Sequence, residues 1–388
     1  MPTRRAVLAA ASATVAGLGG CLSLGSSGAP GRAPDAGDLD DAGDPADANG
    51  ASSANDASGT AGGTASADAP GLTSAAAAVY ERVVPSVVGV LVYDETGLAG
   101  SGSGFVHDGG VVVTNDHVVA GATEVKLRFH GNEWADAAVV GTDPYSDLAV
   151  LDPAARPGDP DPLAFVDADP EPAVGTDVLA IGSPYGYAGS ASEGIVSGVD
   201  RLLPAPNDFL IADAVQTDAA LNPGNSGGPL VTRDGRVAGV VSSAGGENLG
   251  FAISAALARR VVPALAADGA YAHPYVGVRL LEVSPTVAEA YGAADVGGVV
   301  VTDVVAGGPA AGVLRGATGS ETVNGVEVPT GGDVIVAIAG TEVETQADLS
   351  NVLALDTAPG ETVSLTVRRG GRRRTVSLEL GERPAPDA

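Results

Sequence analysis

The chain has 388 residues, with 20 lysine and arginine residues against 48 aspartate and glutamate residues, and therefore a net charge of −28. Hydrophobic residues make up 45% of it and charged residues 18%, so the composition excludes wholesale disorder and the length suits roughly two to three domains. Such a negative charge repels phosphate backbones, which argues against a nucleic-acid partner.

Lysine is almost absent from this acidic chain. Lys126 is the only one, and acidic residues occur throughout the sequence. The pattern is typical of proteins adapted to molar salt, where the electrostatic screening length falls to about 3 Å. The alternative is a protein of ordinary salt tolerance with an acidic tail.

Residues 1–21 have the pattern of a signal peptide. A basic start at 3–5 precedes the apolar run 6–20, which is too short to cross a hydrocarbon core of about 30 Å. The paired arginines resemble a twin-arginine export signal. The string 18–21, LGGC, resembles a lipobox and predicts a lipid anchor on Cys21, the only cysteine. An ordinary export signal with an incidental cysteine is the alternative.

Residues 22–72 consist almost entirely of Gly, Ser, Ala, Asp, Pro and Thr, without an aromatic residue. This composition predicts a disordered acidic linker, because it offers almost nothing to bury. A flexible segment of this length has a root-mean-square reach of roughly 40 Å. The linker would let the folded part stand clear of the membrane to which Cys21 is tethered.

Short valine-rich runs between Gly, Pro and Asp turns predict a mostly β body from residue 73 onward. After a short helical pattern at 79–84, a first set of strands would form one barrel: 87–92, 104–106, 111–114, 125–129, 137–140 and 149–151. A second set would form another: 177–181, 194–199, 209–217, 229–232, 237–242 and 250–253. A helix at 255–267, a break at 268–270 and a third unit with a helix at 346–355 follow.

The string 224–230, GNSGGPL, is a glycine-rich turn that leads into a strand. A serine hydroxyl such as that of Ser226 becomes a nucleophile when a base removes its proton and backbone N–H groups receive the oxyanion. The flanking glycines allow the unusual dihedrals that present those N–H groups. Taken alone, such a string more often means an ordinary Gly-Ser turn.

Two further strings supply partners for this serine. The string 112–119, VVTNDHVV, ends a buried strand with His117, and histidine is the usual general base near neutral pH. The string 143–151, DPYSDLAVL, places Asp147 at the head of an apolar strand, where it could orient an imidazole. Asp143 is the alternative for the acid. A lone histidine usually has a structural role. The three strings together favour a catalytic role for His117 over a structural one.

The chain resembles the HtrA/DegP family of serine proteases, which implies a chymotrypsin-like double β-barrel followed by one PDZ domain. The order His117, Asp147, Ser226 is the chymotrypsin-like order. The resemblance places the protease domain at 73–268, the PDZ domain at 272–381 and a tail at 382–388. It rests on eight strings in family order: 101–106, 114–119, 146–151, 182–186, 194–197, 216–220, 222–230 and 250–253.

The resemblance implies a role for each site residue. His117 would deprotonate Ser226, Asp147 would hold the imidazole tautomer, and the backbone N–H groups of Gly224, Asn225 and Ser226 would bind the oxyanion. The remaining histidines lack this context: His107, His130 and His273. Asp116 departs from the family, which more often has Ala or Asn before the histidine, so it would either raise the histidine pKa or face solvent.

The C-terminal unit resembles a PDZ domain in several strings. Tyr275, Val276, Gly277 and Val278 match the carboxylate-binding loop, whose N–H groups would hold a peptide C-terminus beside a strand edge. The supporting strings are 306–313, 332–335 and the helix at 346–355. The stretch 316–329 is either a long loop or an extra hairpin, and the arginines at 368–374 flank a turn between two strands.

The resemblance implies an exported serine endopeptidase that degrades unfolded or damaged extracytoplasmic proteins by an acyl-enzyme mechanism and binds peptide C-termini. It would be anchored on the outer face of the cell membrane and would assemble as a homotrimer or higher oligomer. No zinc spacing, phosphate-cradling loop or dinucleotide fingerprint occurs in the sequence, so no metal or cofactor is expected. A proteolytically idle chaperone or PDZ-based binding protein is the alternative.

Overall fold

The computed structural model describes residues 74–168, 171–183, 189–204, 209–246, 249–292 and 297–386. The chain divides into two units, Met1–Ser66 and Ala67–Ala388, and all described residues belong to the second. The predicted signal peptide, Cys21 and the linker 22–72 lie outside the described residues. Within the described part of the chain, no helix has the length and apolar character needed to cross a bilayer.

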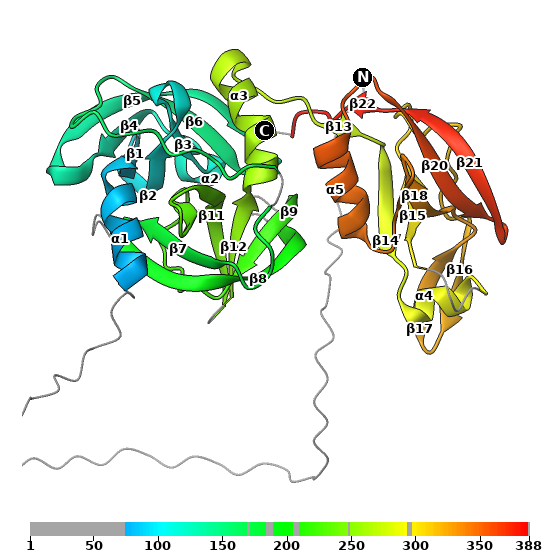
Figure 1. Ribbon diagram of the computed structural model, residues 1–388. Coiled ribbons are helices and arrows are strands. Elements are labelled where there is room, and N and C mark those ends of the chain that lie inside the picture. The colour runs from blue at the N-terminus through cyan, green and yellow to red at the C-terminus, as the bar shows by residue number, and fades with distance from the viewer. Residues whose placement is uncertain are drawn as a thin grey trace, which may run out of the picture. The chain divides into compact units, whose positions relative to one another are not determined.

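The first six strands close into a barrel in the order β1-β2-β3-β6-β5-β4, drawn in cyan tones in Figure 1. Helix α1 (Ser74–Val83) and the 3-10 turn η1 (Val84–Ser86) precede it. Its strands are β1 (Val87–Asp94), β2 (Gly97–Val106), β3 (Val112–Thr114), β4 (Glu124–Arg128), β5 (Trp134–Asp143) and β6 (Leu148–Pro153). Short helical turns interrupt them: η2 (Asp108–Gly110), α2 (Asp116–Val119) and η3 (His130–Asn132).

The next six strands close into a second barrel in the order β10-β11-β12-β9-β8-β7. They are β7 (Asp177–Gly182), β8 (Ser190–Pro204), β9 (Leu210–Thr217), β10 (Pro229–Thr232), β11 (Val237–Gly246) and β12 (Leu249–Ser254). The run predicted at 194–199 is far longer in the structure, because bulges in the β8–β9 pairing let the strand bend and continue. The predicted double barrel is confirmed.

Helix α3 (Ala255–Asp268) follows the second barrel and has defined ends. The Ser254 hydroxyl accepts the Leu257 N–H at its start, and Gly269 ends it with φ 79°, a left-handed conformation that glycine adopts without strain. Its apolar face packs into a buried cluster shared by both barrels, which includes Phe105, Leu148, Val150, Ile181, Val240, Ile253, Val261 and Leu265. This common core fixes the two barrels against each other.

The C-terminal domain is built on a sheet in the order β14-β15-β18-β20-β21, with β19 paired to β18. Its strands are β14 (Val278–Glu282), β15 (Val299–Val304), β18 (Val334–Ile338), β19 (Thr341–Glu342), β20 (Thr362–Arg369) and β21 (Arg372–Glu379). Helices α4 (Pro285–Ala290) and α5 (Gln346–Asp356) accompany it. The core of this domain includes Val301, Ile335, Leu349 and Leu365.

Two short pairings complete the domain. Strands β16 (Gly319–Val323) and β17 (Val326–Thr330) form a hairpin, so the stretch 316–329 is the extra hairpin rather than a loop. Strand β13 (Pro274–Tyr275) pairs with β22 (Gly381–Glu382), so regular structure reaches one residue into the predicted tail 382–388. The arginine-rich segment is a β20–β21 hairpin with Gly370 and Gly371 at its turn, as its sequence predicted.

Candidate active site

His117 stands on α2, directly after a fully buried stretch of the first barrel. Strand β3 is buried at all three residues and Asn115 has no exposed surface, so the start of α2 is fixed by the core. The Asn115 side-chain amide donates to the Asp147 carbonyl oxygen at 2.8 Å. This bond ties the His117 segment to the segment that carries Asp147.

Asp147 places its carboxylate against His117. The imidazole Nδ1 lies 2.8 and 2.9 Å from the two carboxylate oxygens, and the His117 backbone N–H donates to Oδ1 at 3.0 Å. Asp147 is fully buried, whereas the His117 side chain keeps 24% of its surface exposed. Because a carboxylate accepts hydrogen bonds, Nδ1 carries the proton, and the neutral ring keeps a lone pair on Nε2.

The backbone of Asp147 is in the left-handed region, with φ 54°. Aspartate tolerates this conformation better than most residues other than glycine. It occurs between a buried turn residue, Ser146, and the apolar strand β6. The side chain is therefore aimed by a local turn that tertiary packing holds in place.

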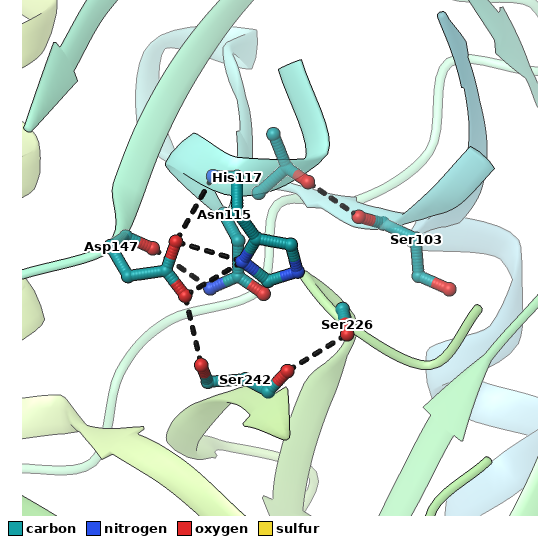
Figure 2. A network of polar contacts seen from close by, with 7 residues as sticks. Ser103, Asn115, His117, Asp147, Ser226 and Ser242 are labelled. Carbon is teal, nitrogen blue, oxygen red and sulfur yellow. Dashed lines mark hydrogen bonds and ion pairs between the residues drawn. The ribbon is translucent and has the colours of Figure 1, made fainter. Parts of the chain in front are cut away.

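Ser226 belongs to the turn that precedes β10 in the second barrel. Its hydroxyl donates to the Ser242 carbonyl oxygen at 2.8 Å, and the Ser242 hydroxyl donates to Asp147 Oδ2 at 2.8 Å. Ser242 therefore links the two halves of the site, and Figure 2 shows the His117 ring beside this chain of contacts. Among the described residues, the Ser226 hydroxyl makes no hydrogen bond with His117.

Glycine is required in the Ser226 turn by close backbone approach. Gly227 has φ 84°, and a Cβ there would lie 2.1 Å from the Ser103 carbonyl oxygen. Ser103 binds the turn at two points, because its N–H donates to the Ser226 carbonyl oxygen at 2.8 Å and its hydroxyl donates to the Gly224 carbonyl oxygen at 2.6 Å. The first barrel thus holds the turn of the second through Ser103.

The backbone N–H groups around Ser226 differ in what they bind. The Asn225 N–H donates to the Asn222 carbonyl oxygen at 3.0 Å, and the Gly227 N–H donates to the Val241 carbonyl oxygen at 2.8 Å. The N–H groups of Gly224 and Ser226 have no acceptor among the described residues. In this arrangement the Asn225 N–H is occupied within the turn, and the oxyanion role of Gly224, Asn225 and Ser226 stays a prediction.

Asp143, the alternative acid, has other partners than His117 among the described residues. It is buried, accepts the Tyr145 N–H at 3.2 Å and the Ser146 hydroxyl, and pairs with His273 Nε2 at 2.7 Å. The other histidines also lie apart: His107 Nδ1 is 2.7 Å from the Leu163 carbonyl oxygen, and His130 is exposed. The structure brings only Asp147 to His117.

Asp116 neither faces solvent freely nor contacts Ser226. It is partly buried beside the catalytic cluster. Burial, together with the negative charges of Asp147 and Asp143, raises the pKa of Asp116 from 3.8 to about 6. Asp116 therefore places a carboxylate with a raised pKa on the residue next to His117.

The predicted carboxylate-binding loop lies between β13 and β14. The Val276 carbonyl oxygen accepts the Ala310 N–H at 3.0 Å, and the Gly277 carbonyl oxygen accepts the Val305 N–H at 2.9 Å. Gly277 has φ 78°, a conformation suited to glycine. Strand β14 has β15 on one side and no strand partner on the other among the described strands, so its edge is open for an added strand.

Sequence reasoning missed Ser242, Ser103 and Asn115 as parts of this site. Ser103 and Asn115 lie inside strings that were singled out, yet the strings do not reveal their contacts. Ser242 stands at the end of an apolar run with no signal of its own. In the described ranges, no group of three or more His, Cys, Asp or Glu side chains is arranged to hold a metal ion.

Two family models match the chain. A trypsin-like peptidase domain matches residues 102–240, and a PDZ domain matches residues 274–380. These ranges contain the site residues His117, Asp147 and Ser226 and the Tyr275 to Val278 loop, respectively. The matches agree with the double barrel and with the separate C-terminal sheet.

Relatives and solved structures agree with these matches. The probable periplasmic serine endoprotease DegP-like of Pseudomonas fulva is 37% identical over 298 residues, which are 74% of this chain and 57% of that protein. The protein of the same name in Chlamydia trachomatis is also 37% identical, over 55% of its length. The chain thus spans little more than half the length of these curated relatives.

The structural neighbours include the HtrA-type protease AlgW with a tripeptide, at a TM-score of 0.64 and 32% identity, covering 80% of this chain and 98% of that one. The serine endoprotease from Yersinia pestis has a TM-score of 0.58 and 26% identity, with 81% and 99% covered. The double barrel, the PDZ match and these likenesses lead to one conclusion: the chain belongs to the HtrA/DegP family of serine proteases.

Proposed function

We propose that the protein is a serine endopeptidase in which Ser226 is the nucleophile, His117 the general base and Asp147 the group that orients the imidazole. The observation that carries this proposal is the chain of contacts from His117 through Asp147 and Ser242 to Ser226. It joins a carboxylate, an imidazole and a hydroxyl from both barrels. The fixed Nδ1 proton leaves Nε2 as the base.

The reaction needs one local movement. The Ser226 hydroxyl turns from the Ser242 carbonyl oxygen toward His117 Nε2, which takes its proton as Ser226 Oγ attacks the substrate carbonyl carbon. The resulting oxyanion is received by the N–H groups of Gly224 and Ser226. The C–N bond then breaks as His117 protonates the leaving amine. In the second half of the reaction, His117 deprotonates a water molecule that attacks the acyl-enzyme carbonyl carbon, and it returns the proton to Ser226 Oγ as the ester bond breaks.

The C-terminal domain would hold substrate chains by their C-termini. The open edge of β14 and the Tyr275–Val278 turn suit an extended peptide that adds a strand to the sheet and ends at backbone N–H groups. The related AlgW has been solved with a tripeptide and with a decapeptide. We expect unfolded or damaged proteins to be the substrates.

The place of action follows from the predicted export signal. The curated relatives are named periplasmic, which supports a location outside the cytoplasm. Lipidation of Cys21 would tether the protein to the outer face of the membrane, with residues 22–72 as the spacer. A homotrimer is the expected assembly, to be measured by sedimentation in molar salt.

The test is digestion of casein in high salt, with released peptides identified by mass spectrometry. Ser226→Ala should lower turnover by several orders of magnitude, because it removes the nucleophile. Ser101→Ala, a change of an exposed serine on β2, is the matched control and should leave turnover unchanged. Comparable activity in Ser226→Ala would contradict the assignment.

A further inference from the structure

The C-terminal domain contains a cavity of about 780 Å³ that has no part in the proposed peptide site. It lies among α4, the loop before β18 and the β20–β21 turn, and neither the Tyr275–Val278 loop nor α5 lines it. Six polar or charged side chains on its wall matter here: Tyr291, Arg315, Arg368, Arg369, Arg372 and Arg374. A cavity of this size is within the range that holds small ligands.

The positive charge of this wall is largely uncompensated. The chain has 20 basic residues against 48 acidic ones, and five of the basic residues meet here. Among the described residues, Asp333 pairs with Arg369, whereas Arg315, Arg368, Arg372 and Arg374 form no ion pair. Arg372 and Arg374 are exposed, and the four guanidinium groups without described carboxylate partners give this wall a local positive charge in an otherwise acidic protein.

The strand register adds a physical reason for a bound anion. In the β20–β21 pairing, Arg369 stands directly opposite Arg372, and both residues line the cavity. Like charges at directly opposed positions destabilise a sheet. An anion between these two guanidinium groups would offset their repulsion and would accept a charge-assisted hydrogen bond from each.

Asp333 positions two of the cavity residues, Arg369 and Arg315. This fully buried carboxylate accepts Arg369 Nε and Nη2, each at 2.7 Å. It also accepts the Arg315 N–H at 3.0 Å, and its own N–H donates to the Arg315 carbonyl oxygen at 2.9 Å. The Arg369 fork and the Arg315 backbone are therefore held in place before any ligand arrives.

Tyr291 supplies a neutral donor on the same wall. Its hydroxyl is buried and makes no hydrogen bond of normal geometry with a described residue, although the Gly332 backbone N–H is near it. The Gly332 N–H can only donate to the hydroxyl oxygen, so the hydroxyl proton has no acceptor among the described residues, and a ligand oxygen would supply one. The cavity thus offers fork-shaped cationic donors together with one hydroxyl donor.

We propose that this cavity is a second binding site that takes a phosphate-bearing anionic ligand. Several guanidinium groups around one volume match the multiple oxygens and higher charge of phosphate better than a single carboxylate. A soluble phosphorylated molecule and a phospholipid headgroup share this chemistry. Ligand binding in this cavity does not depend on proteolysis, so its test is separate from the test of the proposed function.

The test uses the full chain with Cys21→Ser, which cannot be lipidated, at the lowest salt in which circular dichroism shows the folded state. Pyrophosphate binding is measured by calorimetry. Vesicle binding is measured by co-sedimentation with phosphatidylglycerol and with phosphatidylcholine alone. Pyrophosphate binding without vesicle binding would identify a soluble ligand, and selective binding of phosphatidylglycerol would identify a lipid headgroup.

A pair of double variants separates the site from overall charge. Arg315→Gln with Arg372→Gln removes two cavity guanidinium groups, and we expect binding to fall at least about tenfold. Arg156→Gln with Arg201→Gln removes two exposed arginines of the barrels and should change binding less than about twofold. Absence of both kinds of binding, or an equal loss in the two double variants, would overturn the proposal.

Discussion

The two halves of the active site are held in different ways. On the first barrel, His117 and Asp147 are joined by three contacts, and Asp147 is buried without exposed surface. On the second barrel, the Ser226 hydroxyl has one hydrogen bond, to a backbone oxygen, and the N–H groups of Gly224 and Ser226 have no acceptor among the described residues. The proposed base is fixed, whereas the proposed nucleophile and its proposed oxyanion donors keep unused hydrogen-bonding capacity.

This difference indicates where activity can be adjusted. In the proposed mechanism, rotation of the Ser226 hydroxyl would replace its contact with Ser242 by a contact with His117, without movement of the first barrel. A change in the fixed half should therefore remove catalysis, whereas a change in the linking residue Ser242 should only reduce it. The following variants test that order.

The largest effect is expected for Asp147→Asn. It removes the acceptor that keeps the proton on His117 Nδ1, and kcat should fall by about 10⁴-fold, because the wrong tautomer then faces Ser226. Asp143→Asn is the matched control, since Asp143 is also buried but pairs with His273. Casein turnover should fall far less in the control; a larger fall in Asp143→Asn would make Asp143 the acid, and an equal fall would contradict the special role of Asp147.

Gly227→Ala should damage the nucleophile turn. The added Cβ would meet the Ser103 carbonyl oxygen at 2.1 Å in a left-handed backbone position. We expect kcat to drop by about 10²-fold or more and the free energy of unfolding by about 2 kcal/mol. Gly109→Ala, also at positive φ but with nothing within 4 Å of its Cβ, is the control. Thermal unfolding and casein turnover measure the two effects, and full activity in Gly227→Ala would refute the steric argument.

Ser242→Ala should have an intermediate effect. It removes the hydroxyl that binds Asp147 and keeps the backbone oxygen that binds Ser226, so kcat should fall about tenfold through a less well-oriented carboxylate. Ser242→Thr, which keeps a hydroxyl, should recover part of the loss. Ser254→Ala breaks a comparable buried Ser–Asp contact, with Asp213, and should lower stability while kcat stays near wild type. A loss of kcat equal in both alanine variants would indicate a merely structural role for Ser242.

Asp116→Asn should have the smallest effect, and it should depend on pH. Folding raises the pKa of Asp116 from 3.8 to about 6. The wild type therefore loses stability as pH rises from about 4 to about 6, because the folded state binds a proton there that the unfolded state has already lost. Above pH 6 the carboxylate is ionised in the folded and the unfolded state alike. The variant should be more stable by about 1 kcal/mol above pH 6, after allowance for solvent screening, and the difference should shrink toward pH 4.

The control for Asp116→Asn is Asp108→Asn, which changes an exposed aspartate on η2. Denaturant unfolding across the pH range gives the comparison. A pH-independent gain in Asp116→Asn, or the same gain in both variants, would contradict the raised pKa.

The strings in the sequence were sufficient to predict the fold class and to single out His117, Asp147 and Ser226. Each of these residues lies inside a local pattern, a strand end or a glycine turn, that carries its own chemistry. The double barrel was equally accessible, because its strands appear as valine-rich runs between turns. Local patterns of this kind can be recognised in the sequence without knowledge of the tertiary contacts.

The contacts between segments could not be predicted. Ser242 reaches Asp147 only because the middle of β11 lies beside the turn before β6, and no local pattern in the sequence encodes that contact. The occupied Asn225 N–H depends on the exact course of one turn. The arginines at 368–374 looked like a solvated turn, and only the sheet order brings Asp333 and Arg315 to them.

The central claim is that the His117, Asp147 and Ser226 side chains act as one catalytic unit. The most direct measurement is reaction of the full chain with a fluorophosphonate probe, followed by peptide mass spectrometry. The account predicts a covalent adduct on Ser226 that forms far more slowly in Asp147→Asn and is absent in Ser226→Ala. Lack of labelling at Ser226 in every assembly state would contradict it and favour a binding protein without proteolytic activity.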